Sequence, residues 1–360
     1  SKYTLGGEAE AARTSLINTY GWTITDGGGV AEVAYEYEFQ PWSDNIHTIT
    51  TDPAYTYNYN VTVSTGETFT NQTGDLSITF ADRSIVRTLQ ITGLFPATGR
   101  YVVNGPRLKY RIINWGSGLW RSLNSAFELA GSLTDFGPTV PNLQLCTSMN
   151  RTFASFHFAA NIATSNLNSW DVSNVTSMEN CFVLSTGNQN LDISDWNTKN
   201  LTNALYMFSQ SQFNGDITNW DVSSLTNASY MFDRVTLFNQ NISSWNTSNV
   251  TTFRQMFYNT IGNMIFNQPI GSWNTSSATN MRYMLSGCGS FDQDISNWDI
   301  NLVTDFTMLL QLGTLSTTNY DATLISWANQ APLTNKSISF GGSQYTPGGA
   351  AEAARNTLIN

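Results

Sequence analysis

A pattern of hydrophobic and polar positions recurs along the chain from residue 167 onward. Its landmark is a tryptophan, with an apolar residue three positions before it and apolar residues or threonine two and five positions after it. Successive tryptophans are separated by 26, 24, 25, 28 and 25 residues. This regularity predicts a repeat architecture, because one such unit can bury its apolar face only against its neighbours. The six tryptophans are Trp170, Trp196, Trp220, Trp245, Trp273 and Trp298.

Each repeat predicts two short elements. The residues around the tryptophan alternate as in a strand, which directs the intervening polar residues to solvent. In the third full copy the next apolar residues are Leu225, Ala228, Met231 and Phe232, a spacing that fits one or two helical turns. The predicted fold class is therefore a repeat solenoid of leucine-rich-repeat type, with a short strand and a helical turn in each repeat of ~25 residues.

The tryptophans are expected to stack in one hydrophobic spine and to be a main source of stability, since each indole buries a large apolar area. Cys146 and Cys181 fall in apolar slots of the repeat, and Cys288 lies in a turn. The three cysteines have neither zinc-site spacing nor the number that a disulfide framework needs. We interpret them as small apolar core residues.

A different pattern precedes the repeats. Residues Tyr55, Tyr57, Tyr59, Val61 and Val63 alternate with polar residues at a period of two, which is typical of a strand. Further short strand patterns follow, separated by glycine and proline. They predict an all-β sandwich domain over residues 30–115. The repeat region is predicted over 116–318, because two incomplete copies end at Phe127 and Phe153.

The two ends of the chain resemble each other. Twelve of 17 aligned residues are identical between Lys2–Asn18 and Gln344–Asn360, and Tyr345 lies 342 residues after Tyr3. The simplest interpretation is a module of about 342 residues repeated in tandem along a longer polypeptide; the alternative is two cap motifs of one self-contained protein. Residues 1–29 are thus a cap or linker segment, and 319–360 a C-terminal cap and the start of the next module.

Helices are predicted over Ala9–Ile17 and Tyr320–Ala328, and a short strand over Ser337–Phe340. Together these elements are expected to close the open end of the repeats. The chain has no initiator methionine, so we expect it to be a fragment of a longer protein.

Charged residues make up 12% of the chain, about half of the ~25% that is usual. The net charge of −10 argues against nucleic-acid binding, which needs clustered lysine and arginine. No apolar run reaches the ~18 residues of a membrane span. Only two histidines occur, His47 and His157, and no catalytic motif is found. We therefore expect no enzymatic activity, no catalytic residues and no cofactor, with Ca²⁺ left open as the one alternative.

A polar ladder is the candidate binding site. Each tryptophan is followed by an aspartate or asparagine, and stacked strands would place these side chains ~4.8 Å apart. Such a face can bind glycans or protein loops by hydrogen bonds, or coordinate Ca²⁺ through its carboxylates. The alternative is that the ladder only solvates the sheet and hydrogen-bonds to itself. The candidate residues are Asp171, Asn197, Asp221, Asn246, Asn274 and Asp299.

Asn-x-Ser/Thr sequons are frequent, as expected in a chain rich in asparagine, serine and threonine. Glycosylation at them would require a secretory route that supports it. The candidate sites that we single out are Asn60, Asn71, Asn174, Asn249 and Asn274.

The phrase FNGDITNWDVSSLTNASYMF (Phe213–Phe232) resembles the BspA-like leucine-rich-repeat family of bacterial surface proteins. The region Tyr55–Phe95 is similar to the polycystic-kidney-disease-type β-sandwich that often precedes such repeats, although VSTGET replaces the usual Trp-Gly-Asp-Gly turn. The resemblance implies cell-surface display, adhesion, tandem architecture and no catalytic residues.

Two functions follow as hypotheses. The first is an extracellular structural or adhesive module, one period of a surface fibre whose partners are neighbouring copies joined head to tail. The second is an adhesin that recognises a glycan or a host protein through the polar ladder. Loss of binding in a folded protein with Asp221 and Asn246 replaced by alanine would favour the second.

Overall fold

The computed structural model describes residues 3–4, 12–13, 15–16, 19, 29–30, 33–40, 45–98, 110–130, 133–158, 166–260, 263–330 and 337–359. The chain forms two compact units, which we describe separately. Unit 1 comprises Ser1–Thr152 and Ala159–Asn174, and unit 2 comprises Phe153–Phe158 and Val175–Asn360.

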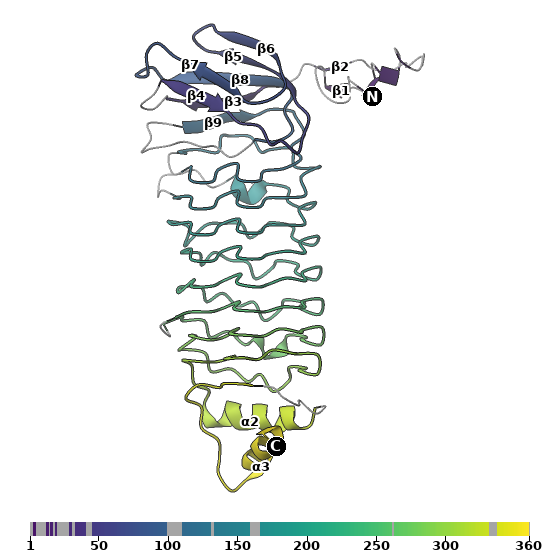
Figure 1. The fold of residues 1–360 in the computed structure, drawn as a ribbon, viewed down its shortest axis with the longest axis vertical. Helices are drawn as coiled ribbons and strands as arrows, with labels where there is room; N and C mark the ends of the chain where they lie inside the picture. Colours follow the sequence, from purple (N-terminus) through teal and green to yellow (C-terminus); the bar gives the residue numbers. More distant parts are fainter. Residues whose placement is uncertain are drawn as a thin grey trace. The chain divides into compact units, whose positions relative to one another are not determined.

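Unit 1 contains the regular strands (Figure 1). A five-stranded antiparallel sheet has the order β6-β5-β8-β3-β9, a second antiparallel sheet pairs β4 with β7, and β1 pairs with β2 in parallel. The two antiparallel sheets resemble a β-sandwich. The strands are β1 Tyr3–Thr4, β2 Gly29–Val30, β3 Tyr35–Phe39, β4 Ile46–Ile49, β5 Asn58–Val63, β6 Thr68–Gln72, β7 Leu76–Thr79, β8 Arg87–Leu94 and β9 Tyr110–Trp115.

Alternating apolar residues explain the five-stranded sheet. In β5, Tyr59, Val61 and Val63 are buried while the residues between them are more exposed, as their period of two predicted. The buried face of the sheet is aromatic: Tyr37 in β3 and Tyr59 in β5 are both 0% exposed. Aromatic side chains bury large apolar areas, so a small sheet with such a face has a substantial core.

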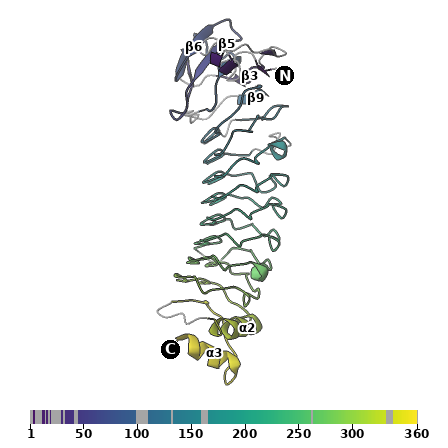
Figure 2. The ribbon, with the colours of Figure 1, turned by 90° about the vertical axis from the view of Figure 1, so that its right-hand side faces the viewer.

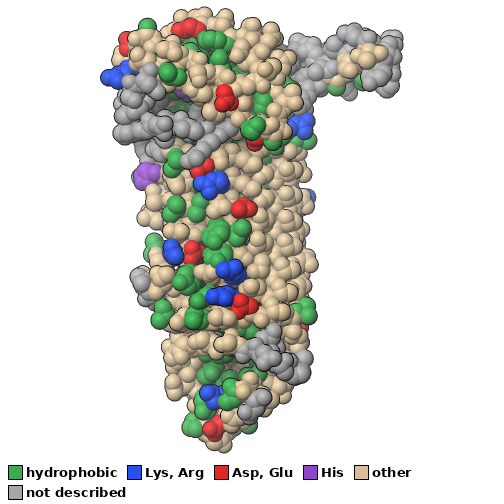
Figure 3. Space-filling view, viewed as in Figure 1, with side chains coloured by type: hydrophobic (Ala, Val, Ile, Leu, Met, Phe, Trp, Pro, Cys, Tyr) green, Lys and Arg blue, Asp and Glu red, His purple; other side chains and the backbone are tan. Residues whose placement is uncertain are grey.

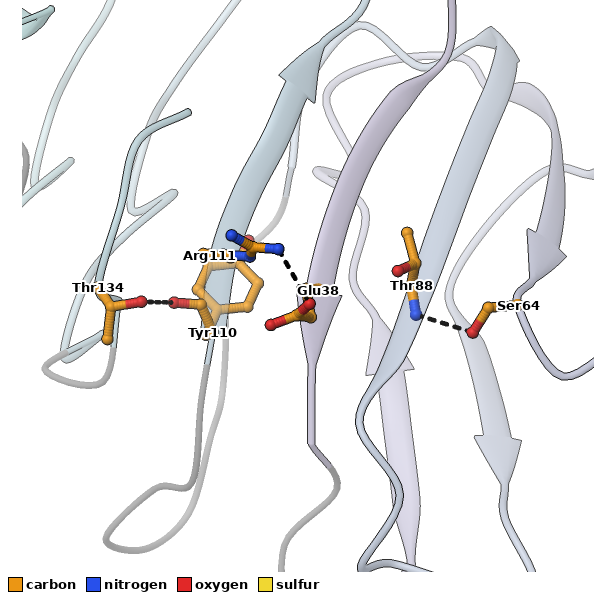
Figure 4. Close-up of polar contacts among 6 residues, drawn as sticks. All are labelled: Glu38, Ser64, Thr88, Tyr110, Arg111 and Thr134. Carbon is orange, nitrogen blue, oxygen red and sulfur yellow. Dashed lines mark hydrogen bonds and ion pairs between the residues drawn. The ribbon is translucent and has the colours of Figure 1, made fainter. Parts of the chain in front are cut away.

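Polar contacts join neighbouring strands of unit 1 (Figure 4). The Arg111 guanidinium in β9 lies 3.2 Å from the Glu38 carboxylate in β3. The Thr88 N–H in β8 donates to the Ser64 hydroxyl, which directly follows β5, at 3.0 Å. These exposed contacts fix register more than they add stability, since exposed ion pairs contribute about 0–1 kcal/mol.

In unit 2 each repeat forms one coil, a path that returns beside its own start one repeat later (Figures 1 and 2). From Ser177 onward, neighbouring coils are joined by a parallel bridge at the same register, rather than by a continuous sheet. The bridge residues follow the buried Val175, Leu201, Leu225, Val250, Ala278 and Val303 by two positions. They are Ser177, Asn203, Asn227, Thr252, Asn280 and Asp305.

The predicted fold class is wrong. We predicted a leucine-rich-repeat solenoid with a short strand and a helical turn in each repeat. Instead, the regular structure of the described residues is mostly β-sheet in unit 1, and its two α-helices lie after the repeats. Between residues 116 and 316, the described repeats consist of turns, isolated bridges and two single 3-10 turns, Leu167–Ser169 and Ile270–Ser272.

Left-handed backbone conformations explain why the Met-Phe segment is not helical. Tyr206 and Gln210, four residues apart, have φ of 55° and 57°, and the neighbouring coil repeats this at Tyr230 and Arg234, both 57°. A right-handed helix tolerates no such residue in its interior. Side chains spaced at i, i+3 and i+7 can therefore be buried without a helix, which the apolar pattern alone could not reveal.

The hydrogen bonds of this segment alternate between two kinds of partner. The N–H of Cys181 donates to the Met178 carbonyl three residues back, at 3.1 Å. The next N–H, that of Phe182, donates to the Met207 carbonyl in the following coil, at 2.7 Å. The segment is thus a run of turns in which every second amide joins neighbouring coils, and the buried backbone is satisfied without regular secondary structure.

Aromatic side chains stack along the coils of unit 2. The indoles of Trp196 and Trp220 are nearly parallel, with centroids 6.2 Å apart and an interplanar angle of 9°. Trp245 and Trp273 stack in the same way, at 6.3 Å and 5°. Each later indole N–H donates to a backbone carbonyl of the preceding coil, for example Trp220 to Ile193 at 3.0 Å. The indoles thus join coils by packing and by hydrogen bonds.

Trp170 belongs to unit 1 and has different neighbours. Its ring meets Trp115 at 5.2 Å and Phe136 at 5.9 Å, in both cases nearly perpendicular. Only five of the six tryptophans are therefore found within unit 2. All six are at most 4% exposed.

Helix α2 (Thr317–Ala328) ends the run of coils by supplying the hydrogen bonds that a further coil would make. Asp292 accepts from the Ser316 N–H at 2.7 Å and from the Asn319 side chain at 2.9 Å. Further along the helix, the Ser326 hydroxyl donates to the Ser296 carbonyl at 2.6 Å. A helix therefore covers the last coil and satisfies its backbone, as terminal repeats require.

The predictions for the chain ends had mixed outcomes. The helix over Tyr320–Ala328 is confirmed as α2, and a further helix, α3, spans Ala350–Ile359. The strand over Ser337–Phe340 is wrong, because these residues have no ladder partner. Of the helix over Ala9–Ile17, residues 12–13 and 15–16 are helical, and the others lie outside the described residues.

The buried indole of Trp220, 3% exposed, makes a stability prediction possible. We expect Trp220→Ala to destabilise the protein by roughly 3–5 kcal/mol, because it leaves a cavity and an unpaired Ile193 carbonyl. Guanidinium denaturation followed by circular dichroism measures this. Asn219→Ala, at the exposed preceding position, is the matched control and should stay within about 0.5 kcal/mol of the parent. Equal stabilities of the two variants would contradict the stacked-coil account.

The left-handed residue Gln210 tests the turn geometry, since its side chain is exposed. We expect Gln210→Gly to be neutral or to stabilise by up to about 1 kcal/mol, and Gln210→Val to destabilise by about 1–2 kcal/mol. Lys199→Gly, at an exposed position without positive φ, should destabilise by about 0.5–1 kcal/mol. Guanidinium denaturation measures these changes, and a Gln210→Gly variant that loses as much stability as Lys199→Gly would contradict the described backbone.

Candidate binding face

The six candidate ladder residues all occupy the same position of the repeat, directly after a buried tryptophan. Five of them are exposed and Asp299 is half-buried. Asp171 lies in unit 1 and the other five lie in consecutive coils of unit 2. On the face in view in Figure 3, charged and hydrophobic side chains are scattered over the coils beside an area that shows only backbone and other side chains.

Each ladder side chain is engaged by its own backbone. The Asp221 carboxylate accepts from the Ser223 N–H at 2.9 Å, and the Asn246 amide oxygen accepts from the Ser248 N–H at 3.2 Å. The remaining four make the same contact two residues ahead, at 3.0–3.3 Å. These are Asx turns, in which a short polar side chain caps a bend of the chain. A turn role thus accounts for the choice of aspartate or asparagine at this position.

Two other positions of the repeat form the same turn. One precedes the isoleucine that lies three residues before the tryptophan, and the other is the bridge position. A coil must change direction several times within ~25 residues, and asparagine and aspartate allow this at low cost. The residues are Asp192, Asp216, Asn241 and Asp294 at the first position and Asn203, Asn227, Asn280 and Asp305 at the second.

An asparagine ladder that the sequence analysis missed joins four coils. The Asn239 N–H donates to the Asn214 side chain at 3.0 Å, and the Gln240 amide donates to the Asn214 carbonyl at 2.9 Å. The pattern repeats in the next two coils, through Asn267 and Asp292. The available signal was a phenylalanine seven residues before the tryptophan, which asparagine or aspartate follows.

A threonine ladder was also missed. The hydroxyl of Thr202 donates to the Thr176 carbonyl of the preceding coil at 3.0 Å, and that of Thr226 donates to the Thr202 carbonyl at 3.0 Å. Thr251, Thr279 and Thr304 continue the series at 2.9–3.1 Å. These side chains are exposed, yet their donors bond to the protein itself. The recurring polar side chains of the repeat thus hold coils together.

The candidate glycosylation sites are partly engaged as well. The Asn174 amide donates to the Gln144 carbonyl at 3.1 Å, and the Asn249 amide to the Ser223 carbonyl at 2.6 Å. The Asn60 side chain accepts from the Asn71 N–H at 2.9 Å. Asn274 is the ladder residue whose oxygen caps a turn. A glycan on Asn174 or Asn249 would replace a donor that now bonds to a neighbouring coil.

Electrostatics differ between exposed and buried aspartates of the coils. Hydrogen bonds from the Ser223 side chain and N–H lower the pKa of Asp221, and the nearby Lys199 lowers it further. Hydrogen bonds from the Thr218 N–H and hydroxyl lower the pKa of Asp216. Burial raises the pKa of Asp233, which is 4% exposed. The Asx turns therefore favour ionised carboxylates.

Other sequence-based expectations can be placed on the structure. Cys146, Cys181 and Cys288 are each 0% exposed, which confirms their interpretation as core residues. Among the described residues, no three His, Cys, Asp or Glu side chains gather closely enough to hold a metal ion. None of the described helices is long and apolar enough to cross a membrane. Calcium binding to the ladder stays a prediction.

Comparison with known families identifies the repeats. The model of a family described as "Mycoplasma protein of unknown function, DUF285" matches residues 147–264 and 260–345, which is more than half of the chain. The chain belongs to the DUF285 family. The searches of curated proteins and of solved structures gave no match. In this DUF285 protein, the matched region covers the coils with their asparagine and threonine ladders and helix α2.

The lowered pKa values predict an acid dependence for this DUF285 protein. Asp216 and Asp221 have folded pKa values below their ordinary 3.8, so their contribution to stability is complete above that value and is lost as the pH falls through the folded pKa. We expect the melting temperature to fall less between about pH 6 and about pH 2 in Asp216→Asn/Asp221→Asn than in the parent. Calorimetric melts measure this, and equal falls would contradict it.

Asp233 serves as a control of opposite sign. Because its folded pKa is raised, its contribution to stability increases as the pH falls through that value. Asp233→Asn removes this gain, so its melting temperature should fall more than that of the parent over the same pH range.

Proposed function

We propose that this protein is an extracellular structural module, one unit of an adhesive or fibrous surface assembly built from copies joined head to tail. The observation that carries the proposal is the use of the repeated polar side chains. The Asx turns, the asparagine ladder and the threonine ladder all bond to the protein's own backbone. A repeat that devotes its recurring side chains to cohesion suits a load-bearing module.

Two further features support this proposal. The resemblance of Phe213–Phe232 to BspA-like surface proteins suggests display outside the cell. The similarity between Lys2–Asn18 and Gln344–Asn360 is what a head-to-tail series of modules would produce. With 12% charged residues and ladders of neutral hydrogen bonds, the stability of the chain is expected to depend little on salt concentration, which suits a protein outside the cell.

The localisation can be tested by immunogold electron microscopy with antibodies raised against the purified chain. We expect labelling of intact cells of the producing organism, arranged on surface filaments or layers. A cytoplasmic protein, labelled only after permeabilisation, is the control. Labelling of this protein only after permeabilisation would exclude the proposal.

Binding arrays of glycans and extracellular proteins separate a structural module from a ligand-specific adhesin. A structural module should give no signal, or one that Asp221→Ala/Asn246→Ala does not change. A signal abolished by that substitution in a folded protein would overturn the purely structural role and establish the polar ladder as a binding site. Asn219→Ala, at an exposed neighbouring position, is the matched surface control.

A further inference from the structure

Residues Gln344–Ile359, which we call the docking segment, end in helix α3. Helix α3 packs against helix α2 (Figures 1 and 2). The Thr346 N–H and hydroxyl donate to the Asp321 carboxylate of α2 at 3.0 and 2.5 Å. Ala351, in the first turn of α3, is buried at 3% exposed. The segment thus consists of a strap, residues 344–349, that hydrogen-bonds to α2 through Thr346, followed by helix α3, in which the small residue Ala351 is buried.

Contacts inside the segment keep this shape. The Arg355 guanidinium lies over the Tyr345 ring, 5.3 Å from its centroid. The Gly348 N–H donates to the Glu352 carboxylate at 2.7 Å. Both contacts connect the strap to α3 and so orient the helix for docking.

The N-terminal segment Lys2–Asn18 retains every residue that makes these contacts. Five positions differ between the two segments, and all five are exposed in the C-terminal copy: Gln344, Pro347, Ala350, Asn356 and Thr357. The contact residues correspond to Tyr3, Thr4, Gly6, Ala9, Glu10 and Arg13. The differences thus leave the residues that make these contacts unchanged.

The described parts of the N-terminal copy agree in the helix but differ before it. Tyr3–Thr4 form β1, which pairs with β2, whereas the equivalent Tyr345 and Thr346 belong to no strand, so docking requires this two-residue pairing to open. Residues 12–13 and 15–16 are helical, and the Thr19 N–H donates to the Ser15 carbonyl at 2.9 Å. The chain thus carries two segments with the same set of contact residues in their sequence. The sequence of the helix that receives the C-terminal one, TTNYDATLISWA, occurs once.

We infer that residues 2–18 of one copy bind helix α2 of a second copy, in the place that α3 occupies within a single chain. Thr4 would then bond to Asp321 of the second copy, and Ala9 would be buried where Ala351 now lies. This inference deepens the proposed head-to-tail assembly and rests on it. Its test measures association in solution rather than location on the cell, so the two can fail independently.

Competition within the chain determines how the exchange is observed. Helix α3 belongs to the same chain as α2, so its effective concentration is on the order of millimolar. A segment from another molecule at micromolar concentration cannot displace it. Residues 2–18 of a second copy would form the same contacts with α2 that α3 forms. A substitution that weakens the binding of α3 to α2 should therefore make the association between copies detectable.

The experiment uses the full-length chain with Ala351→Arg, which places a long cation at a buried position of α3. A fluorescent peptide of residues 2–18 is titrated into this variant and into the parent, and anisotropy is measured. We expect the peptide to bind the variant at least about tenfold more tightly than the parent. Sedimentation velocity should show a shift from monomer to dimer and larger species in the variant alone.

Matched peptides decide whether the contact is the one inferred. Ala9→Arg in the peptide should weaken binding by at least about tenfold. Thr14→Arg, which adds the same charge at the position aligned with the exposed Asn356, should leave it within about twofold. Absence of binding to the Ala351→Arg chain, or equal binding of the Ala9→Arg peptide, would overturn the inference.

A second variant guards against misfolding. Arg355→Pro interrupts α3 by removing a backbone donor, and leaves α2 and the coils unchanged. For both Ala351→Arg and Arg355→Pro, a circular dichroism spectrum and a denaturation midpoint equal to those of the parent would establish that the coils are folded. Self-association that persists in Ala351→Arg/Ala9→Arg would reveal non-specific adhesion of α2 and would likewise overturn the inference.

Discussion

The coils of unit 2 depend on one constraint, which is that each backbone amide and carbonyl buried between coils must find a partner without regular secondary structure. The alternation seen at Cys181 and Phe182 meets this constraint, because one amide closes a turn and the next joins the following coil. Left-handed residues such as Tyr206 and Gln210 make the alternation possible. Everything else in the repeat is arranged around that path, including the aromatic stacks in its interior and the Asx turns at its corners.

The same constraint explains the composition of the chain. A helix or a sheet satisfies its backbone with few demands on side chains, whereas these coils leave corners and edges that side chains must serve. Short uncharged side chains, such as those of Asn214 and Thr202, can hydrogen-bond to the backbone of a neighbouring coil without the desolvation cost of a charged group. The abundance of asparagine, serine and threonine, and the scarcity of charge, therefore suit the backbone path of the coils.

How much of this could be read from the sequence depended on which physical signal was periodic. The spacing of the tryptophans was sufficient to define the repeat unit and its register. The strand pattern at Tyr59, Val61 and Val63 was equally direct. The prediction of a helical turn failed because residues buried at i, i+3 and i+7 are compatible with more than one backbone conformation. Only the φ angles distinguish these conformations. The residues of the polar ladder do share one position of the repeat, but Asp221 and Asn246 cannot be recognised as turn caps without knowing where their side chains point. Their role in binding stays a prediction.

Helix α2 meets the last coil through Ser316, Asn319 and Ser326, and each of these replaces a group that an additional coil would supply. The edge that it covers is therefore chemically the same as the boundary between any two coils. A duplication of one whole repeat in the gene would insert one more coil. Its N-terminal side would match the coil before it, and its C-terminal side would match the next coil or helix α2. Recombination can then change the number of coils one repeat at a time, because helix α2 can cover the last coil whatever that number is.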